Sequence, residues 1–278
     1  MARILDTTPA FEAYARTAFL ESTAVREQQW QDRYEGAHAE VFESFYAKEP
    51  ATDGRKALVR ELSSLRQRVG EAAPALTGIV EEVDRQVKAA LGVTAASAPV
   101  HVLIVGPSST NAVVGRLGDD VALFHCLEWF RSPDGARVLA AHEDAHAWHE
   151  IALGEEPPTD DVAWMAFSEG MAIHASRAVV PGRPEDDYFW FGYDGFEDWL
   201  AWCQERRDEL VRRFGEALDD PAAVDTFFGA GLVEGRWRVG YFVADEVVKG
   251  LGRTLPELAA MSVAEGREAV RAALATAG

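Results

Sequence analysis

The chain has 278 residues, of which 48% are hydrophobic, and a formal net charge of -19 at pH 7. That length and composition suffice to bury one substantial core. Because nucleic acids and anionic membrane surfaces are bound by Lys and Arg, the strong acidity argues against both as partners.

The N-terminal residues and the cysteines bear on location. The first twenty residues carry Asp6, Glu12 and Arg16 and have no uninterrupted apolar run, so no signal peptide is expected. The sequence has no run of 18 apolar residues, which a membrane-spanning helix requires. Cys126 and Cys203 lie in apolar segments and are expected to be buried and reduced. These features predict a cytoplasmic protein.

The first third of the chain is expected to be helical. Residues 8–48 and 54–92 are rich in Ala, Glu, Arg and Leu, with apolar residues at three- and four-residue spacing. Residues 50–54, Pro-Ala-Thr-Asp-Gly, predict a turn between these two long helices. The pattern therefore predicts an N-terminal helical region over 1–97, followed by a second domain over 98–278.

Three short strands open the second domain. A β-branched run covers 100–105, and further apolar runs cover 111–115 and 121–126. Gly118-Asp119-Asp120 between the last two runs is typical of a hairpin turn. Helices are predicted after Pro133, at 134–153, 160–179, 195–214, 235–250 and 263–276. The predicted fold class is α+β and predominantly helical, with a small three-stranded sheet packed against the first of these helices.

That first helix contains His142-Glu143-Asp144-Ala145-His146, which reads H-E-x-x-H. Four residues are just over one helical turn, so both imidazoles leave the same face and can bind one ion. Zinc accepts neutral histidine nitrogens, and a glutamate at this position can take a proton from a metal-bound water. The motif therefore predicts a metal site.

A catalytic zinc needs a third protein ligand, and Glu169 is the expected one. The connection over 154–159 is short, so the helices before and after it are expected to be antiparallel neighbours. Counting back from this connection places Glu169 between the two histidines. Its apolar neighbours predict burial, and a buried carboxylate needs a partner such as a metal. The alternative is an exposed helical glutamate, the commoner place for this residue type.

The other histidines are weaker candidates. His149 shares the helix face of His146, and is expected either beside the site or as an exposed or capping residue. His174 points about 140° away from the third ligand and is expected to be structural. His101 and His125 lie in predicted strands, where a core or surface role is expected.

Two motifs support a family resemblance. Glu169-Gly170-Met171-Ala172 after H-E-x-x-H resembles the arrangement of gluzincins, metallopeptidases that bind zinc with two histidines and one glutamate. The longer pattern with a third histidine is excluded, because Ala152 stands at the required position. Arg238-Val239-Gly240-Tyr241-Phe242 is similar to an R-x-G-Y-[YF] helix in a bacterial family of predicted zinc-dependent proteases, described as a domain of unknown function. The resemblance covers residues 98–262.

The resemblance implies that His142, His146 and Glu169 bind one zinc ion per chain and that Glu143 is the general base. Residues 98–278 are then a zincin-like catalytic domain.

Such a site also needs a donor for the oxyanion that forms when water attacks a carbonyl. Tyr241 and Arg238 are the candidates by their place in the matching helix; Arg236, Tyr188 and Tyr193 are less favoured. The alternatives are a core aromatic role for Tyr241 and a surface salt bridge for Arg238.

The predicted function is zinc-dependent hydrolysis of peptide or related amide bonds in a peptide or protein substrate. A strand at 111–116 or 121–126 is expected to pair with an extended substrate. The aromatic segment over 187–193 either lines a substrate pocket or packs over the core, and the second interpretation is favoured.

Two other functions stay open. Two histidines and one carboxylate also form the metal site of non-haem iron oxygenases. Alternatively, the metal stabilises a non-catalytic binding or regulatory protein, although a structural site has no need of Glu143 as a general base. The sequence leaves the oligomeric state open.

Overall fold

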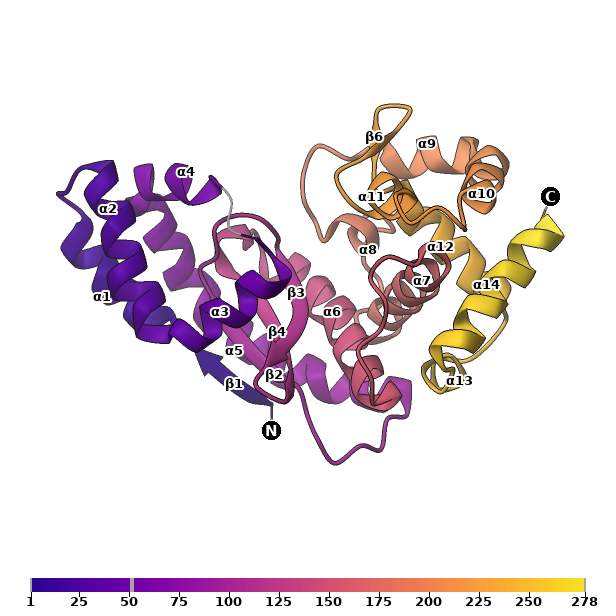
Figure 1. Cartoon of the computed structure of the whole chain (residues 1–278), viewed down its shortest axis with the longest axis horizontal. Helices are drawn as coiled ribbons and strands as arrows, with labels where there is room; N and C mark the ends of the chain where they lie inside the picture. The colour runs from indigo at the N-terminus through magenta and orange to yellow at the C-terminus, as the bar shows by residue number, and fades with distance from the viewer. Residues whose placement is uncertain (1, 51–52, 278) are drawn as a thin grey trace. The chain divides into compact units, whose positions relative to one another are not determined.

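The computed structural model describes residues 2–50 and 53–277 (Figure 1). The chain is 64% helical, with one four-stranded and one two-stranded sheet, which confirms the α+β, predominantly helical class. Its residues form two compact units, Met1–Arg85 with Ser97–Glu143 and Gln86–Ala96 with Asp144–Gly278. The chain passes from one unit to the other at three points, which lie inside α5 (Leu62–Leu91), between Ala96 and Ser97, and inside α6 (Pro133–Leu153). The domain boundary that the sequence predicts between residues 97 and 98 stays a prediction.

The sheet of the first unit has the strand order β1-β2-β4-β3. It consists of β1 (Arg3–Asp6), β2 (Val100–Ile104), β4 (Asp120–Cys126) and β3 (Ala112–Leu117). Strands β1, β2 and β4 are parallel neighbours, and β3 is antiparallel to β4. The three predicted strands are present, and β1 is an additional one. Four residues are too few for a clear alternating pattern, so only pairing with β2 reveals β1 as a strand.

The predicted hairpin is confirmed. Leu117 pairs with Asp120, which leaves Gly118 and Asp119 as a two-residue turn. Gly118 has a φ of 59°, a conformation that glycine adopts without steric cost.

The two faces of β2 pack against different helices. Val102 and Ile104 pack with Phe45 of α3 (Ala39–Lys48) on one face. Leu103 belongs instead to the apolar cluster that contains Val80 of α5 (Leu62–Leu91). Because side chains alternate along a strand, His101 lies on the same face as Leu103.

The prediction of one uninterrupted helix over 8–48 is wrong. The chain there forms α1 (Thr8–Ala18), α2 (Thr23–Gln29), the π-helix η1 (Trp30–Glu35), the 3-10 helix η2 (Gly36–His38) and α3. The Ser22 hydroxyl accepts a hydrogen bond from the Val25 backbone N–H and so caps the start of α2. The rings of Phe11 and Trp30 pack edge to face with their centroids 5.7 Å apart. This contact requires the chain to reverse direction between the two residues.

The second predicted helix, 54–92, consists of α4 (Gly54–Arg60) and α5. The predicted turn at 50–54 includes residues 51 and 52, which lie outside the described residues. Between β4 and α6 the chain makes one 3-10 turn, η3 (Leu127–Trp129).

The second unit is built around α7 (Val162–Val179), α12 (Val239–Gly250) and α14 (Val263–Ala277). Its smaller elements are α8 (Asp187–Trp190), α9 (Trp199–Glu205), α10 (Arg207–Glu216), α11 (Ala223–Phe228), β5 (Leu232–Val233), β6 (Arg236–Trp237) and α13 (Leu255–Ala259). The predicted helix at 195–214 is therefore two helices.

The helix predicted to begin at 235 begins at Val239 instead. Val233 pairs with Arg236, so Glu234 and Gly235 form the turn of the β5–β6 hairpin. Both turn residues have positive φ angles, 51° and 79°, which is the geometry of a tight β-hairpin turn. Residues 235–237, which were expected to begin the helix, belong to this hairpin instead.

Burial decides two of the other expectations. Within 187–193, Tyr188, Phe189, Trp190 and Phe191 are all buried, in agreement with packing over the core. Cys126 and Cys203 are buried and free, and burial raises the pKa of Cys203 to about 12. Among the described residues, every helix is too short or too polar to cross a bilayer.

Helices α7 and α12 approach each other at a glycine. A Cβ on Gly170 would clash with the backbone oxygen of Ala244 and with the side chain of Val248. The backbone of α12 can therefore lie against α7 only because residue 170 has no side chain. Gly170 follows Glu169 directly, so this contact also holds the helix segment that carries the predicted third ligand.

We expect Gly170→Ala to lower the free energy of unfolding by about 1–3 kcal/mol, because the added methyl group forces the two helices apart. The matched control is Gly250→Ala in α12, where an added Cβ meets nothing within 4 Å. The control should leave stability unchanged or raise it by up to about 1 kcal/mol. Chemical denaturation followed by circular dichroism measures both, and equal stability of the two variants would contradict the packing argument.

Candidate metal centre

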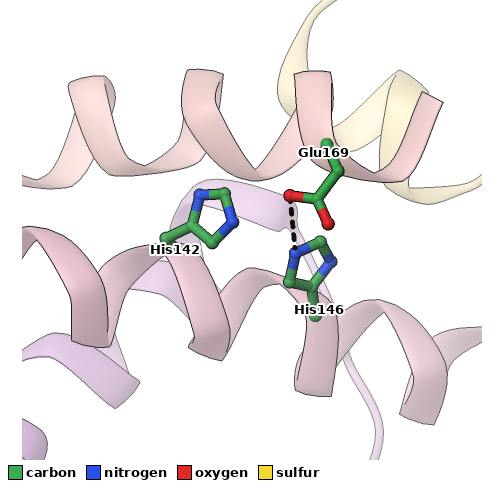
Figure 2. A group of neighbouring side chains, drawn as sticks. All are labelled: His142, His146 and Glu169. Atoms are coloured by element: carbon green, nitrogen blue, oxygen red, sulfur yellow. Dashed lines mark ion pairs between the residues drawn. The ribbon is translucent and has the colours of Figure 1, made fainter. Parts of the chain in front are cut away.

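His142 and His146 leave α6 one turn apart, and Glu169 projects toward them from α7 (Figure 2). One nitrogen of each imidazole and one Glu169 carboxylate oxygen all lie within 4.8 Å of one another. The structure thus brings together the three residues that the sequence predicts as ligands. That they bind a metal stays a prediction.

The spacing of the donor atoms fits a shared ion. His146 Nε2 lies 3.5 Å from Glu169 Oε2. Two ligands bound to one tetrahedral zinc at about 2.1 Å are about 3.4 Å apart. Two imidazoles and one carboxylate form a donor set that zinc accepts, with a fourth position left for water. The residues present therefore fit a catalytic zinc.

Burial supports the same interpretation. His142 is 2% exposed and Glu169 is 7% exposed, which rules out the alternative of a solvent-facing Glu169. Transfer of a carboxylate out of water is costly unless a cation or hydrogen bonds compensate it. His146 and Glu143 are only half-buried, so one side of the site is open to solvent.

Ser168 orients one of the predicted ligands. Its Oγ lies 3.0 Å from His146 Nδ1. When Nδ1–H donates to this hydroxyl, the lone pair of Nε2 is directed toward Glu169 and is available for a metal. The sequence motifs did not indicate Ser168, although it stands directly before Glu169, the predicted third ligand.

Glu49 is a second residue that the sequence did not indicate. It follows α3 and is half-buried. Burial, and to a smaller extent the negative charge of Glu143, raise the pKa of Glu49. Glu49 is therefore an acidic neighbour of Glu143, the predicted general base.

His149 is a buried aromatic residue of the core. It is 1% exposed, and its ring stacks on Trp164 with centroids 5.4 Å apart. Burial, opposed by a hydrogen bond to the Met261 backbone, lowers its pKa to about 4, so the ring is neutral at pH 7. The alternative of an exposed or capping His149 is wrong, because the ring is buried and hydrogen-bonds to the backbone of Met261, which follows α13 (Leu255–Ala259).

The remaining histidines lie away from the ligand face of α6. His174 Nε2 lies 3.1 Å from Asp245 Oδ1, in agreement with the predicted structural role. His101 and His125 are buried in β2 and β4 and stack on each other.

Arg238 lies among aromatic rings rather than in a surface salt bridge. Its guanidinium carbon is 4.0 Å from the centroid of Tyr241 and 5.3 Å from that of Trp190. Tyr241 in turn packs edge to face on Phe228. These contacts account for the packing of both residues, and their role as oxyanion donors stays a prediction.

The less favoured donors have other contacts. The Arg236 guanidinium pairs with Asp198 through two hydrogen bonds of 2.8 Å. The Tyr188 hydroxyl donates to the Val180 carbonyl oxygen at 2.8 Å. Tyr193 follows α8, and its backbone N–H donates to the Trp190 carbonyl oxygen.

A scan against protein-family models matched no family, and searches of curated proteins and of solved structures also gave no match. The resemblance to gluzincins therefore rests on the motifs alone.

We expect Ser168→Ala to weaken zinc binding by about 10- to 100-fold, because His146 loses the partner that orients its ring. Ser176→Ala is the matched control on the same helix, since its hydroxyl donates only to the Ile173 carbonyl oxygen one turn earlier. Competition with a zinc-binding dye measures both affinities. Equal affinities of the two variants would exclude the orienting role of Ser168.

Proposed function

We propose that this protein is a zinc-dependent hydrolase of peptide or related amide bonds. The observation that carries the proposal is the buried Glu169 carboxylate, 3.5 Å from His146 Nε2, beside an H-E-x-x-H helix that also bears Glu143. The resemblance to gluzincins supports the same reaction class.

Zinc bound by His142, His146 and Glu169 would lower the pKa of its bound water to about 7 and polarise the scissile carbonyl. Glu143 accepts the proton of the attacking water and passes it to the leaving nitrogen. Glu143 follows His142 directly on α6 and is half-buried. Tyr241 and Arg238 remain the proposed donors to the oxyanion.

The sheet topology narrows the proposed binding of an extended substrate. Strand β4 lies between β2 and β3, so both of its edges are already paired. The expectation that 121–126 accepts a substrate strand is therefore wrong. Strand β3 lies at the edge of the sheet and belongs to the same unit as Glu143, and it is the strand that we propose for strand addition.

The proposal also covers the binding partners of the protein and its cellular location. The substrate is a peptide or protein, and the net charge of -19 disfavours nucleic acid and anionic membranes as partners. A cytoplasmic location fits two cysteines that are buried and unpaired with each other.

We expect His142→Ala to remove about one equivalent of zinc per chain relative to the wild type. Elemental mass spectrometry of protein purified without chelators measures the loss. Iron in place of zinc would instead favour the oxygenase, which uses the same three ligands. An unchanged metal content would exclude His142 as a ligand.

We expect Glu143→Gln to retain zinc and to lower peptide hydrolysis by about 100-fold or more, because the amide cannot accept the proton of water. A peptide library analysed by mass spectrometry detects the products. Glu155→Gln, an exposed position after α6, makes the same chemical change and should keep full activity. Full activity of Glu143→Gln would refute the assigned base, and a zinc-loaded but inactive wild type would favour a binding protein.

A further inference from the structure

A second group of possible ligands lies around Asp144, the third residue of the H-E-x-x-H motif. Asp84 of α5, His101 of β2 and Asp144 of α6 each offer one ligand atom, and these atoms lie within 4.8 Å of one another. Asp144 is two residues from His142 and from His146, and so points about 200° away from them around the helix. The group therefore lies behind the ligand face of α6 and shares no residue with the first site.

All three residues are buried. His101 and Asp144 are 0% exposed and Asp84 is 9% exposed. Two buried carboxylates are stable only where positive charge or hydrogen bonds compensate their negative charge. A divalent cation between them would neutralise both.

The distances suit an ion better than direct hydrogen bonds. His101 Nε2 lies 3.6 Å from Asp84 Oδ1, which is too long for a hydrogen bond. It is close to the separation of about 3.4 Å between two ligands on one tetrahedral ion. The same relation holds in the first site, where the corresponding distance is 3.5 Å.

His125 supports His101 from the other side of the ring. His101 Nδ1 lies 3.3 Å from His125 Nε2, and the two rings are stacked with an interplanar angle of 10°. His125 Nε2 can accept a hydrogen bond from His101 Nδ1–H at this distance. Nε2 of His101 then carries a lone pair directed at the carboxylates, the orientation that a metal ligand requires.

We propose that Asp84, His101 and Asp144 form a second site for a divalent transition cation, of which zinc is the example to test. One imidazole and two carboxylates are ligands that such cations accept. The ion would link α6 to β2 and α5 and so fix the helix that carries His142 and His146. Its role would be structural, because the three residues that would bind it are themselves buried.

The test is the zinc content of the full-length chain after purification without chelators, measured by elemental mass spectrometry. We expect about two equivalents in the wild type, about one in His142→Ala, about one in His101→Gln, and none in the double variant. His38→Gln, in the same unit as His101 but at a half-buried position in η2, is the matched control and should keep both ions.

The outcomes separate the two sites. Zinc retained in His142→Ala but lost in the double variant supports the second site, even if the first site and the proposed hydrolase fail. A wild type with one zinc that disappears in His142→Ala and persists in His101→Gln overturns it. If circular dichroism shows that His101→Gln does not fold, the test depends on His142→Ala alone. A His142→Ala protein that contains no metal would then refute the second site. Zinc added to metal-depleted His142→Ala should also raise the melting temperature of this variant, and an unchanged melting temperature would count against the site.

Discussion

The candidate site depends on one interaction, the burial of the Glu169 carboxylate against His146. A carboxylate that is 7% exposed has lost most of its contact with water, and the chain must compensate its charge. The two helices that meet here provide the imidazoles of α6 on one side and the carboxylate of α7 on the other (Figure 2). The shared cation that we propose would satisfy all three groups at once, and the donor atoms of the two helices lie at a spacing that fits it.

Three consecutive residues of α7 each contribute a different contact to this site. Ser168 holds the ring of His146 through its Nδ1, Glu169 supplies the carboxylate, and Gly170 allows α12 to lie against the helix backbone. Successive residues on a helix point about 100° apart, so this short segment contacts α6 through Ser168 and Glu169 and α12 through Gly170. The position of the carboxylate is therefore set by the packing of α7 on α12 as well as by the groups that it contacts.

Helix α6 is unusual in burying polar groups on opposite faces. His142 and His146 lie on one face, and Asp144 lies on the face behind them. Each face needs partners that come from elsewhere in the chain: α7 for the histidines, and α5 and β2 for Asp144. Buried polar groups on both sides restrict rotation of the helix about its axis, because a turn in either direction would separate these groups from their neighbours on one face or the other.

Local patterns in the chain were sufficient to predict the fold class, three of the strands, the H-E-x-x-H helix and Glu169 as the third residue of the site. These features depend on periodicities of two and 3.6 residues and on one short connection, which are local properties of the chain. The other features depend on contacts between segments that are distant in the chain. The helix expected over 8–48 is broken where Phe11 packs on Trp30, and β1 exists only through its pairing with β2. Ser168 contacts His146, and Asp144 lies beside Asp84 and His101, although the residues in each group are far apart in the sequence. Such contacts result from the packing of helices and strands on one another. They cannot be predicted from the spacing of residues within a single segment.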